Sequence, residues 1–210
     1  MAVDRASSAE ASISWYDANA EDFVARTLGP GMEGVRARFL AHVPPGGAVL
    51  DAGCGSGRDA LAFKQAGYAA SAFDGSARLA AIAADNTGLP VRHLTFAQMD
   101  WSEAFDGVWA CATLLHLAPA DLPAALAGIW RALKPGGAFY CSFKEGGTER
   151  FANGRYFTDM TLEGLRALIV AAGFESLDLW DSDDGRADHA GERWVSAVSR
   201  RPMADAPPLA

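Results

Sequence analysis

The stretch VLDAGCGSGRDALAF, residues 49–63, joins an apolar strand to a helix through a glycine-rich turn. Three of the five residues from Gly53 to Gly57 are glycines, and Arg58 follows them directly. Glycine adopts positive φ angles and, because it lacks a Cβ, lets a ligand lie against the backbone. Phosphates, dinucleotides and adenosyl compounds all bind turns of this kind, so the surrounding sequence has to distinguish between them.

A carboxylate follows the turn at the end of the next strand. The segment YAASAFD, residues 68–74, has the pattern of a strand and ends on Asp74. Strand, glycine turn, helix, strand and terminal acid together form a nucleoside-binding unit. In such a unit the carboxylate can accept hydrogen bonds from both ribose hydroxyls.

Two familiar ligand motifs fail on spacing. The dinucleotide pattern Gly-x-Gly-x-x-Gly needs a glycine at its sixth position, which is Arg58 when counted from Gly53 and Ala60 when counted from Gly55. A phosphate-binding loop needs Gly-Lys followed by Ser or Thr, and none stands at the required distance. The turn therefore matches neither an NAD fingerprint nor a P-loop.

Size and charge favour one domain with a small soluble ligand. The 210 residues are 50% hydrophobic, which is enough for a core of their own. A formal net charge of -8, from 26 acidic and 18 basic residues, opposes general attraction to nucleic acid or to anionic membranes. The sequence contains no apolar run of signal-peptide or membrane-helix length. We therefore expect neither a membrane nor a nucleic acid as partner.

The cysteines and the acidic stretches predict no metal site. Cys54, Cys111 and Cys141 are far apart and odd in number, without the paired spacing of a zinc site or a disulfide framework. They are expected to be small buried hydrophobic residues of a cytoplasmic protein. The segment WDSDDGRADH fails as a calcium loop, because Arg186 stands where glycine is required. We interpret this segment as a solvated connection between two strands.

Short apolar runs alternate with helical patterns along most of the chain, which predicts parallel strands joined by helices. The last third instead carries two strands separated by a polar stretch, which predicts an antiparallel hairpin at one sheet edge. The expected strands are 48–53, 68–74, 91–99, 105–115, 138–144, 174–180 and 192–198, and the expected helices are 58–67, 76–88, 121–133 and 161–173. We assign residues 13–200 to the domain, between disordered tails at 1–12 and 201–210.

Four segments in order resemble the class I S-adenosylmethionine-dependent methyltransferase family: VLDAGCGSGRDALAF, YAASAFDGS, FDGVWACATLLHL and LKPGGAFY. The resemblance covers residues 15–145. It implies a Rossmann-like, seven-stranded, mostly parallel sheet with helices on both faces, in agreement with the order of the elements. Within the family, the small-molecule enzymes of the tellurite-resistance type are the most similar.

The resemblance also implies which residues hold the cofactor. The glycine loop would pass under its methionine and ribose parts, Asp74 would bind the ribose, and the segment 13–27 would form a lid helix. The adenine would lie beyond the third strand, and the fourth strand would offer backbone oxygens to the amino group. The resulting set of cofactor-binding residues is Tyr16, Asp51, Gly53, Cys54, Gly55, Gly57, Arg58, Asp74, Gly75, Met99, Asp100 and Cys111.

Several of these assignments have a structural alternative. Arg58 in the first turn of a helix opposes the helix dipole, so an anion such as the methionine carboxylate would favour it there, but Asp59 is an equally simple partner. Met99 could contact the adenine or fill the core. Tyr16 could approach the sulfonium with its ring or hydroxyl, or could pin the lid helix to the sheet together with Trp15.

Methyl transfer from a sulfonium depends chiefly on positioning, because the leaving group becomes neutral. An alcohol, amine or thiol acceptor additionally needs a base to remove its proton. His116 is the histidine nearest the predicted mouth of the site and is the candidate base. The alternative is a structural hydrogen bond to a neighbouring loop.

The segment FKEGGTERFANGRYF, residues 143–157, is expected to lie over the acceptor side of the site. Lys144, Arg150, Arg155 and Tyr156 could bind an anionic or flat aromatic acceptor through charge-assisted hydrogen bonds and stacking. The alternative is a glycine-rich surface loop whose charges pair with Glu145, Glu149 and Asp159.

We therefore predict a methyltransferase that uses S-adenosylmethionine, yields S-adenosylhomocysteine and modifies a small molecule, including an oxyanion such as tellurite. A tRNA or protein methyltransferase would share the same core, but such enzymes usually add a basic surface or a recognition domain. A non-catalytic S-adenosylmethionine-binding protein is the other alternative.

Overall fold

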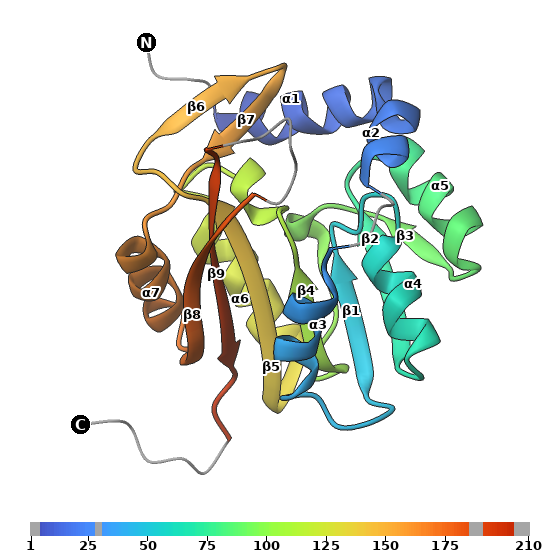
Figure 1. Cartoon of the computed structure of the whole chain (residues 1–210), viewed down its shortest axis with the longest axis vertical. Coiled ribbons are helices and arrows are strands. Elements are labelled where there is room, and N and C mark those ends of the chain that lie inside the picture. Colours follow the sequence, from blue (N-terminus) through green and yellow to red (C-terminus); the bar gives the residue numbers. More distant parts are fainter. Residues whose placement is uncertain (1–4, 28–30, 185–190, 204–210) are drawn as a thin grey trace.

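A seven-stranded sheet flanked by helices forms the body of the protein (Figure 1). The computed structural model describes residues 5–27, 31–184 and 191–203. The strands are Ala48–Ala52 (β1), Ala69–Asp74 (β2), Val91–His93 (β3), Phe105–Ala110 (β4), Leu133–Lys144 (β5), Glu149–Ala152 (β6), Arg155–Thr158 (β7), Glu175–Asp183 (β8) and Arg193–Arg200 (β9). The helices are Arg5–Ala18 (α1), Ala20–Thr27 (α2), Glu33–Leu40 (α3), Arg58–Gln65 (α4), Ala77–Thr87 (α5), Leu122–Ala132 (α6) and Leu162–Ala171 (α7).

The strand order in the main sheet is β3-β2-β1-β4-β5-β9-β8. Strands β1 to β5 are parallel, whereas β9 runs antiparallel to both β5 and β8. The chain moves outward from β1 to β3 and then returns to place β4 on the other side of β1, so the order reverses beside β1. In open α/β sheets, ligands bind at the carboxyl ends of strands at such a reversal. The predicted fold class, including the antiparallel hairpin, is confirmed.

Alternation along the strands divides the core between the two faces of the sheet. On one face, Val49 and Trp109 pack with Phe39 of α3 and Phe63 of α4. On the other face, the strand residues that alternate with them pack against α6 and α7, with Ile129 and other apolar side chains of those helices fully buried. Helices α3, α4 and α5 thus cover one face and α6 and α7 the other (Figure 1).

Helices α1 and α2 and the hairpin of β6 and β7 cross the carboxyl edge of the sheet (Figure 1). The Ser12 side chain of α1 accepts a hydrogen bond from the Tyr156 N–H of β7 at 3.0 Å. On the other side, the Ser76 hydroxyl before α5 donates to Asp17 at 2.5 Å. The N-terminal helices are therefore attached at both ends of the edge where the candidate site lies.

The structure corrects several expectations from the sequence. Residues 5–12 belong to α1 and not to a disordered tail, because the segment is rich in alanine and has no glycine or proline to stop the helix. Arg201 is 9% exposed and donates to the Leu133 carbonyl, so the expected C-terminal tail does not begin there. Residues 1–4 and 204–210 of those tails lie outside the described residues. Neither α3 nor the β6–β7 hairpin was predicted, and β3 is shorter than expected.

Among residues 5–27, 31–184 and 191–203, no helix has the length and apolar character needed to cross a membrane.

The contact between β4 and α3 gives a direct test of this packing. A Cβ on Gly107 would lie 2.6 Å from Phe39 Cζ and 2.9 Å from Val43 Cγ2. Both side chains are buried, so Gly107→Ala should overpack the face and lower the free energy of unfolding by about 1–3 kcal/mol. Thermal unfolding should show this as a melting temperature lower by roughly 2–12 °C.

Gly34→Ala is the matched control for this prediction. A Cβ at this exposed position on α3 meets no atom within 4 Å, and alanine is the better helix former. The control should leave the melting temperature unchanged or raise it slightly. Equal melting temperatures for Gly107→Ala and Gly34→Ala would contradict the tight packing of α3 on β4.

Candidate functional site

The candidate site begins with the turn between β1 and α4, at the carboxyl edge of the sheet. Gly53, Gly55 and Gly57 have φ angles of 75°, 55° and 77°, which fall in the left-handed region. Side chains with a Cβ rarely adopt these angles, so glycine is required by the backbone itself. The Gly53 and Cys54 N–H groups both donate to the Phe73 carbonyl of β2 at 2.9 Å, which fixes the turn beside the end of that strand.

The bare face of the turn is closely covered by other elements. A Cβ on Gly53 would lie 2.0 Å from Thr113 Oγ1, and one on Gly55 would lie 3.1 Å from the Phe23 ring of α2. A Cβ on Gly57 would lie 2.7 Å from Thr87 Cγ2 of α5. The turn therefore has room for glycine only, and neither Thr113 nor Phe23, which cover it, was among the predicted site residues. Thr113 opposes Gly53 because β4 pairs with β1, which only the sheet order reveals.

Asp74 lies at the end of β2 with its carboxylate turned toward the glycine turn. Its Oδ2 accepts a hydrogen bond from Gly55 N–H at 2.8 Å, and its Oδ1 accepts one from Ser76 N–H at 2.8 Å. The residue is 8% exposed, and burial raises the pKa of its carboxyl despite these two bonds. Each carboxylate oxygen accepts two hydrogen bonds, so the group retains acceptor capacity.

Asp51 and Cys54 support the turn from within. Asp51 is 3% exposed, and its Oδ2 accepts from Ala60 N–H in the first turn of α4 at 2.9 Å. Burial, together with the nearby Asp59 carboxylate, raises the pKa of Asp51 well above its usual range. Burial likewise raises the pKa of the Cys54 thiol, which packs among small residues of α4 and α5. Both predicted residues thus adjoin the turn as parts of its buried support.

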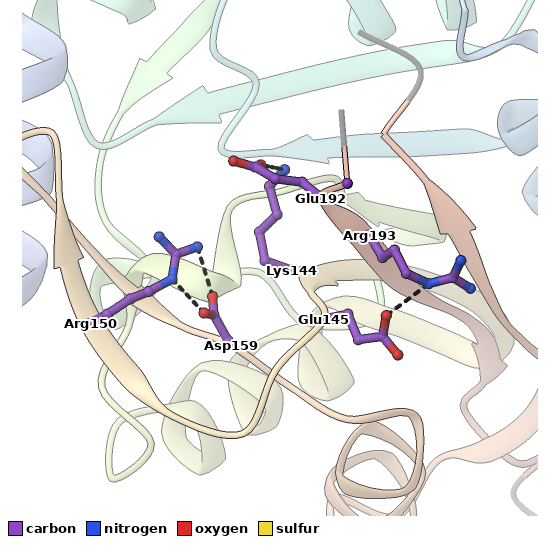
Figure 2. Close-up of a pocket in the computed structure, with 7 residues that line it drawn as sticks. Lys144, Glu145, Arg150, Asp159, Glu192 and Arg193 are labelled. Carbon is purple, nitrogen blue, oxygen red and sulfur yellow. Dashed lines mark hydrogen bonds and ion pairs between the residues drawn. The ribbon is translucent and has the colours of Figure 1, made fainter. Parts of the chain in front are cut away.

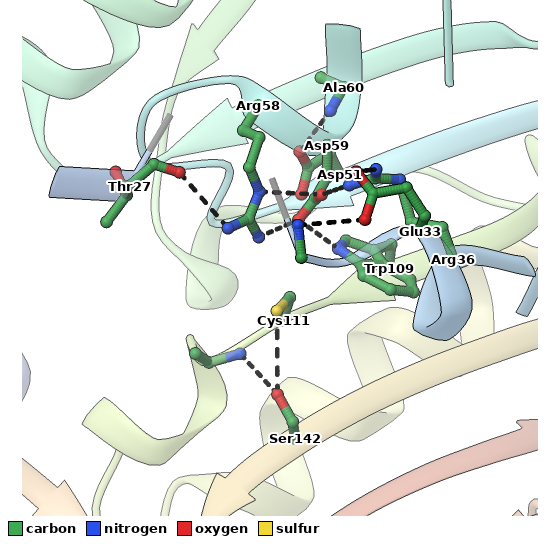
Figure 3. A network of polar contacts seen from close by, with 12 residues as sticks. Thr27, Glu33, Arg36, Asp51, Arg58, Asp59, Ala60, Trp109, Cys111 and Ser142 are labelled. Carbon is green, nitrogen blue, oxygen red and sulfur yellow. Dashed lines mark hydrogen bonds and ion pairs between the residues drawn. The ribbon is translucent and has the colours of Figure 1, made fainter. Parts of the chain in front are cut away.

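Arg58 is engaged in a buried ion cluster around Asp59 (Figure 3). Its Nη2 lies 2.8 Å from Asp59 Oδ2, and the same carboxylate accepts from Arg36 Nη1 at 2.7 Å and from Trp109 Nε1 at 3.1 Å. A further hydrogen bond of 3.4 Å reaches the Thr27 carbonyl at the end of α2. The ion pair with Asp59, one of the two alternatives stated for Arg58, is present in the structure. A role toward a ligand carboxylate stays a prediction.

Three further residues were predicted to bind the cofactor: Gly75, Met99 and Asp100. The Gly75 carbonyl hydrogen-bonds His93, and a Cβ on Gly75 would lie 3.1 Å from Ile13 of α1. Met99 is 4% exposed within the core facing α6, which is the structural alternative for this residue. Asp100 has a side chain 68% exposed and pairs with an arginine of β3. A role of Asp100 toward the adenine stays a prediction.

Cys111 follows the end of β4 on the same carboxyl edge (Figure 3). Its thiol receives a long contact of 4.0 Å from the Ser142 hydroxyl, and that hydroxyl oxygen accepts from Ala112 N–H at 2.9 Å. Burial raises the pKa of the Cys111 thiol to about 12, so it is protonated at neutral pH and a poor nucleophile.

Arg155, Tyr16 and His116 form one continuous hydrogen-bond chain. Arg155 Nη1–H donates to the Tyr16 hydroxyl oxygen at 3.2 Å, and that hydroxyl lies 2.9 Å from His116 Nε2. On its other side, His116 Nδ1 lies 2.7 Å from the Tyr156 carbonyl. Burial, together with a smaller effect of the Arg155 cation, lowers the pKa of His116 to about 4, so the ring is neutral at pH 7. The structure thus brings the candidate base and the candidate lid tyrosine together.

Aromatic rings surround the Arg155 guanidinium. It lies 4.4 Å from the centre of the Trp15 ring, 5.2 Å from that of Phe157 and 5.6 Å from that of Tyr16. Its Nε–H is buried and has no hydrogen-bond partner among the residues that the structure describes. Within the described part of the chain, the structure pairs this guanidinium with no carboxylate. Arg155 is therefore a cation held by ring faces and not neutralised by an acid.

The remaining acceptor-side cations are neutralised. A charged pocket of about 300 Å³ beside the end of β5 contains Lys144 and Arg150 (Figure 2). Lys144 pairs with Asp184 at 2.8 Å and with Glu192, and Arg150 Nη2 donates to Asp159 Oδ1 at 3.1 Å. The pairing of Arg150 matches the structural alternative stated for the loop, whereas Lys144 pairs with acids from outside it.

Tyr156, the fourth predicted acceptor residue, points away from solvent. It is 2% exposed, and its hydroxyl donates to the Glu149 carboxylate of β6. Burial and this bond to an anion raise the pKa of Tyr156 to about 12. Its contribution to the candidate site is the backbone carbonyl that fixes His116.

A model of the methyltransferase domain family matches residues 49–137. No curated protein sequence matches the chain significantly. Among solved structures, 1,6-didemethyltoxoflavin-N1-methyltransferase from Burkholderia thailandensis, bound to 1,6-didemethyltoxoflavin and S-adenosylhomocysteine, is similar with a TM-score of 0.80. That match has 26% sequence identity and covers 96% of this chain and 92% of the other.

Two more distant structures share the fold. Magnesium protoporphyrin IX methyltransferase from Synechocystis PCC 6803, with bound S-adenosylmethionine, has 18% identity, a TM-score of 0.71, and coverage of 94% of this chain and 98% of that one. The [4+2]-cyclase SpnF has 22% identity, a TM-score of 0.67 and coverage of 81% of both chains. Together, the domain match and the shared fold support the prediction that the chain is an S-adenosylmethionine-dependent methyltransferase.

The Asp59 cluster provides a stability test of this edge. Asp59→Ala would leave Arg36 and Arg58 without their shared carboxylate and the buried Trp109 N–H without an acceptor. Removing one partner of a buried ion cluster typically costs about 3–5 kcal/mol, so the melting temperature should fall by roughly 6–20 °C. Thermal or urea unfolding followed by circular dichroism measures this change.

Asp100→Ala is the matched control, since it breaks a surface ion pair whose aspartate side chain is 68% exposed. Exposed pairs contribute about 0–1 kcal/mol, so the control should melt within a few degrees of the wild type. If the two variants melted alike, Asp59 could not be the shared counter-ion of a buried cluster.

Proposed function

We propose that the protein binds S-adenosylmethionine against the Gly53–Gly57 turn and transfers its methyl group to a small-molecule acceptor. The observation that carries this proposal is the arrangement of the Asp74 carboxylate beside a turn whose three glycines have positive φ. The arrangement lies where the strand order of the sheet reverses. The similarity to the Burkholderia enzyme over nearly the whole chain supports the same ligand class.

The residues of the turn fit an adenosyl ligand chemically. Asp74 retains acceptor capacity on both oxygens, as two ribose hydroxyls would require. Burial raises the pKa of Asp74, which means that its charged form lacks solvation and would gain from additional donors. No Cβ occupies the turn at Gly53 or Gly55, and the Thr113 and Phe23 side chains lie close to the space that a Cβ would take.

S-adenosylmethionine supplies a methyl group on a positively charged sulfur and leaves as neutral S-adenosylhomocysteine. The main task of the protein in such a displacement is to align the acceptor with the methyl carbon and exclude water. The N-terminal helices are suited to exclude water from the site, because their hydrogen bonds attach them across the edge of the sheet, from the segment before α5 to β7. Phe23 of α2 lies directly over Gly55 and would close the turn from above.

The acceptor that we propose is an anionic or aromatic small molecule, a class that includes oxyanions such as tellurite. Arg155 supports this choice, because its guanidinium lies among aromatic rings and its Nε–H has no partner. Lys144 and Arg150 are less suited to recognise an anion, since both are already paired with carboxylates. Incubation with labelled S-adenosylmethionine and a panel containing 1,6-didemethyltoxoflavin, catechol, 2-mercaptoethanol and tellurite should yield a methylated product detectable by mass spectrometry.

The ligand assignment predicts a specific effect of Asp74→Asn. In the wild type, S-adenosylhomocysteine at a hundredfold excess over its dissociation constant should raise the melting temperature by about 5–10 °C, and NAD should not. Hydrogen bonds to a charged group contribute about 1.5–3 kcal/mol, so Asp74→Asn should weaken S-adenosylhomocysteine binding by roughly 10–100-fold in calorimetry.

Asp85→Asn makes the same chemical change on the exposed side of α5 and should bind like the wild type. Comparing affinities, not melting temperatures, separates ligand binding from the support that Asp74 gives to the Gly55 and Ser76 N–H groups. Unchanged affinity in Asp74→Asn would remove the ribose assignment. A wild type that responds to NAD alone would overturn the proposed function.

A further inference from the structure

The hydrogen-bond chain from Arg155 to the Tyr156 carbonyl has a fixed direction. A carbonyl oxygen can only accept, so the proton of the His116 ring is on Nδ1, 2.7 Å from Tyr156 O. In a neutral ring the other nitrogen, Nε2, is then unprotonated and accepts the Tyr16 O–H at 2.9 Å. Arg155 Nη1–H donates to the same Tyr16 oxygen at 3.2 Å. Tyr16 therefore points its proton at a base while its oxygen faces a cation.

This chain lies directly beside the glycine turn. Thr113, which opposes Gly53, precedes the short helical turn Leu114–His116, and the His116 N–H donates to the Thr113 carbonyl at 3.0 Å. From the other side, the Tyr16 ring contacts Phe23, the residue above Gly55, with ring centres 5.0 Å apart. Tyr16 is thus linked to the turn at Gly53 through His116 and Thr113, and at Gly55 through Phe23.

We propose that Tyr16 is the catalytic residue that takes the proton of the methyl acceptor and that His116 is the terminal proton acceptor behind it. This inference rests on the proposed function and specifies the proton path in it. His116 Nε2 is covered by the Tyr16 hydroxyl, so an acceptor that reaches the site meets the tyrosine oxygen first. Arg155 is a positioning residue that stabilises negative charge on that oxygen during the transfer.

The step balances without any further reagent. The lone pair of the acceptor forms the bond to the methyl carbon while the carbon–sulfur bond breaks and its electron pair stays on sulfur. The acceptor proton moves to the Tyr16 oxygen as the Tyr16 proton moves to His116 Nε2, which leaves an imidazolium held by the Tyr156 carbonyl. The proton is afterwards released to water. A base of low strength suffices, because the acceptor atom becomes strongly acidic as it gains the methyl group.

The chain offers two variants that remove one function each. Tyr16→Phe deletes the hydroxyl and keeps the ring that packs on Trp15, Phe23 and His116. His116→Asn deletes the proton acceptor, while its amide N–H can still donate to the Tyr156 carbonyl in place of Nδ1. Loss of packing or of the structural bond therefore does not explain a defect that the two variants share.

The first measurement needs no acceptor. Two-bond ¹H–¹⁵N spectra of the wild type with S-adenosylhomocysteine should show His116 with a protonated Nδ1 and an unprotonated Nε2, assigned by comparison with His116→Asn. Tyr16→Phe should shift the Nε2 resonance and leave Nδ1 nearly unchanged. A proton on Nε2 in the wild type would overturn the proposal, because Tyr16 could then not donate to that nitrogen.

The second measurement compares acceptors with and without a proton to lose. Catechol, 2-mercaptoethanol and 1,6-didemethyltoxoflavin form the first set, and iodide and pyridine the second. Tyr16→Phe and His116→Asn should each lower kcat for the first set by about 10²–10⁴-fold relative to the second. The double variant should be no slower than the worse single variant, because residues that act as one unit are not additive. Equal losses for both sets, or additive losses, would overturn the relay.

Failure of the relay and failure of the proposed function give different results. If S-adenosylmethionine and S-adenosylhomocysteine leave the melting temperature of the wild type unchanged, the proposed function fails. If they bind and the variants keep wild-type rates with proton-bearing acceptors, only the relay fails. If they bind and no acceptor in either set reacts, the protonation state of His116 decides the inference by itself.

Discussion

The left-handed backbone of the Gly53–Gly57 turn is the constraint on which the rest of the carboxyl edge depends. Only glycine adopts these φ angles at low cost, and a Cβ at Gly53 or Gly57 would collide with Thr113 or Thr87. Because the turn is this tight, α4 starts directly above β1 with its first N–H groups beside Asp51 and Asp74 lies within reach of the Gly55 N–H. The proposed ligand cradle and the packing of α4 and α5 are thus consequences of one backbone conformation.

Charge pairing separates the ionic side chains of this edge into those that hold the structure together and those that remain available to a ligand. Asp59 pairs with two arginines in a partly buried cluster, and the acids around the charged pocket pair with Lys144 and Arg150 (Figures 2 and 3). Such clusters hold loops in place but have little charge left for a ligand. Arg155 differs, because ring faces and a tyrosine hydroxyl are its neighbours. Its position next to Tyr16 and His116 would link the proposed recognition of an anion to the proposed removal of a proton.

Attachment of the N-terminal helices connects the cofactor and acceptor sides. Helix α1 is hydrogen-bonded to the segment before α5 at one end and to β7 near the other, while Tyr16 between them reaches His116. The β6–β7 hairpin contributes Arg155 and the carbonyl that orients His116. A movement of α1 would therefore change the cover of the glycine turn and the hydrogen bond to the candidate base together.

The sequence by itself determined the fold class, the glycine turn and the position of Asp74, because each depends on local features: strand periodicity, glycine spacing and a residue at the end of a strand. The position of His116 directly after the fourth strand also predicted a place near the mouth, and the resemblance to the methyltransferase family predicted the same for Tyr16. The tertiary structure alone decided their partners, since Tyr16 and His116 are a hundred residues apart and meet only when α1 packs over the sheet. It likewise distinguished Arg155 from Lys144 and Arg150, which are paired with carboxylates, and showed that Met99 is buried in the core. Burial and charge pairing depend on distances between distant segments, and those distances are set by the packing of the whole chain.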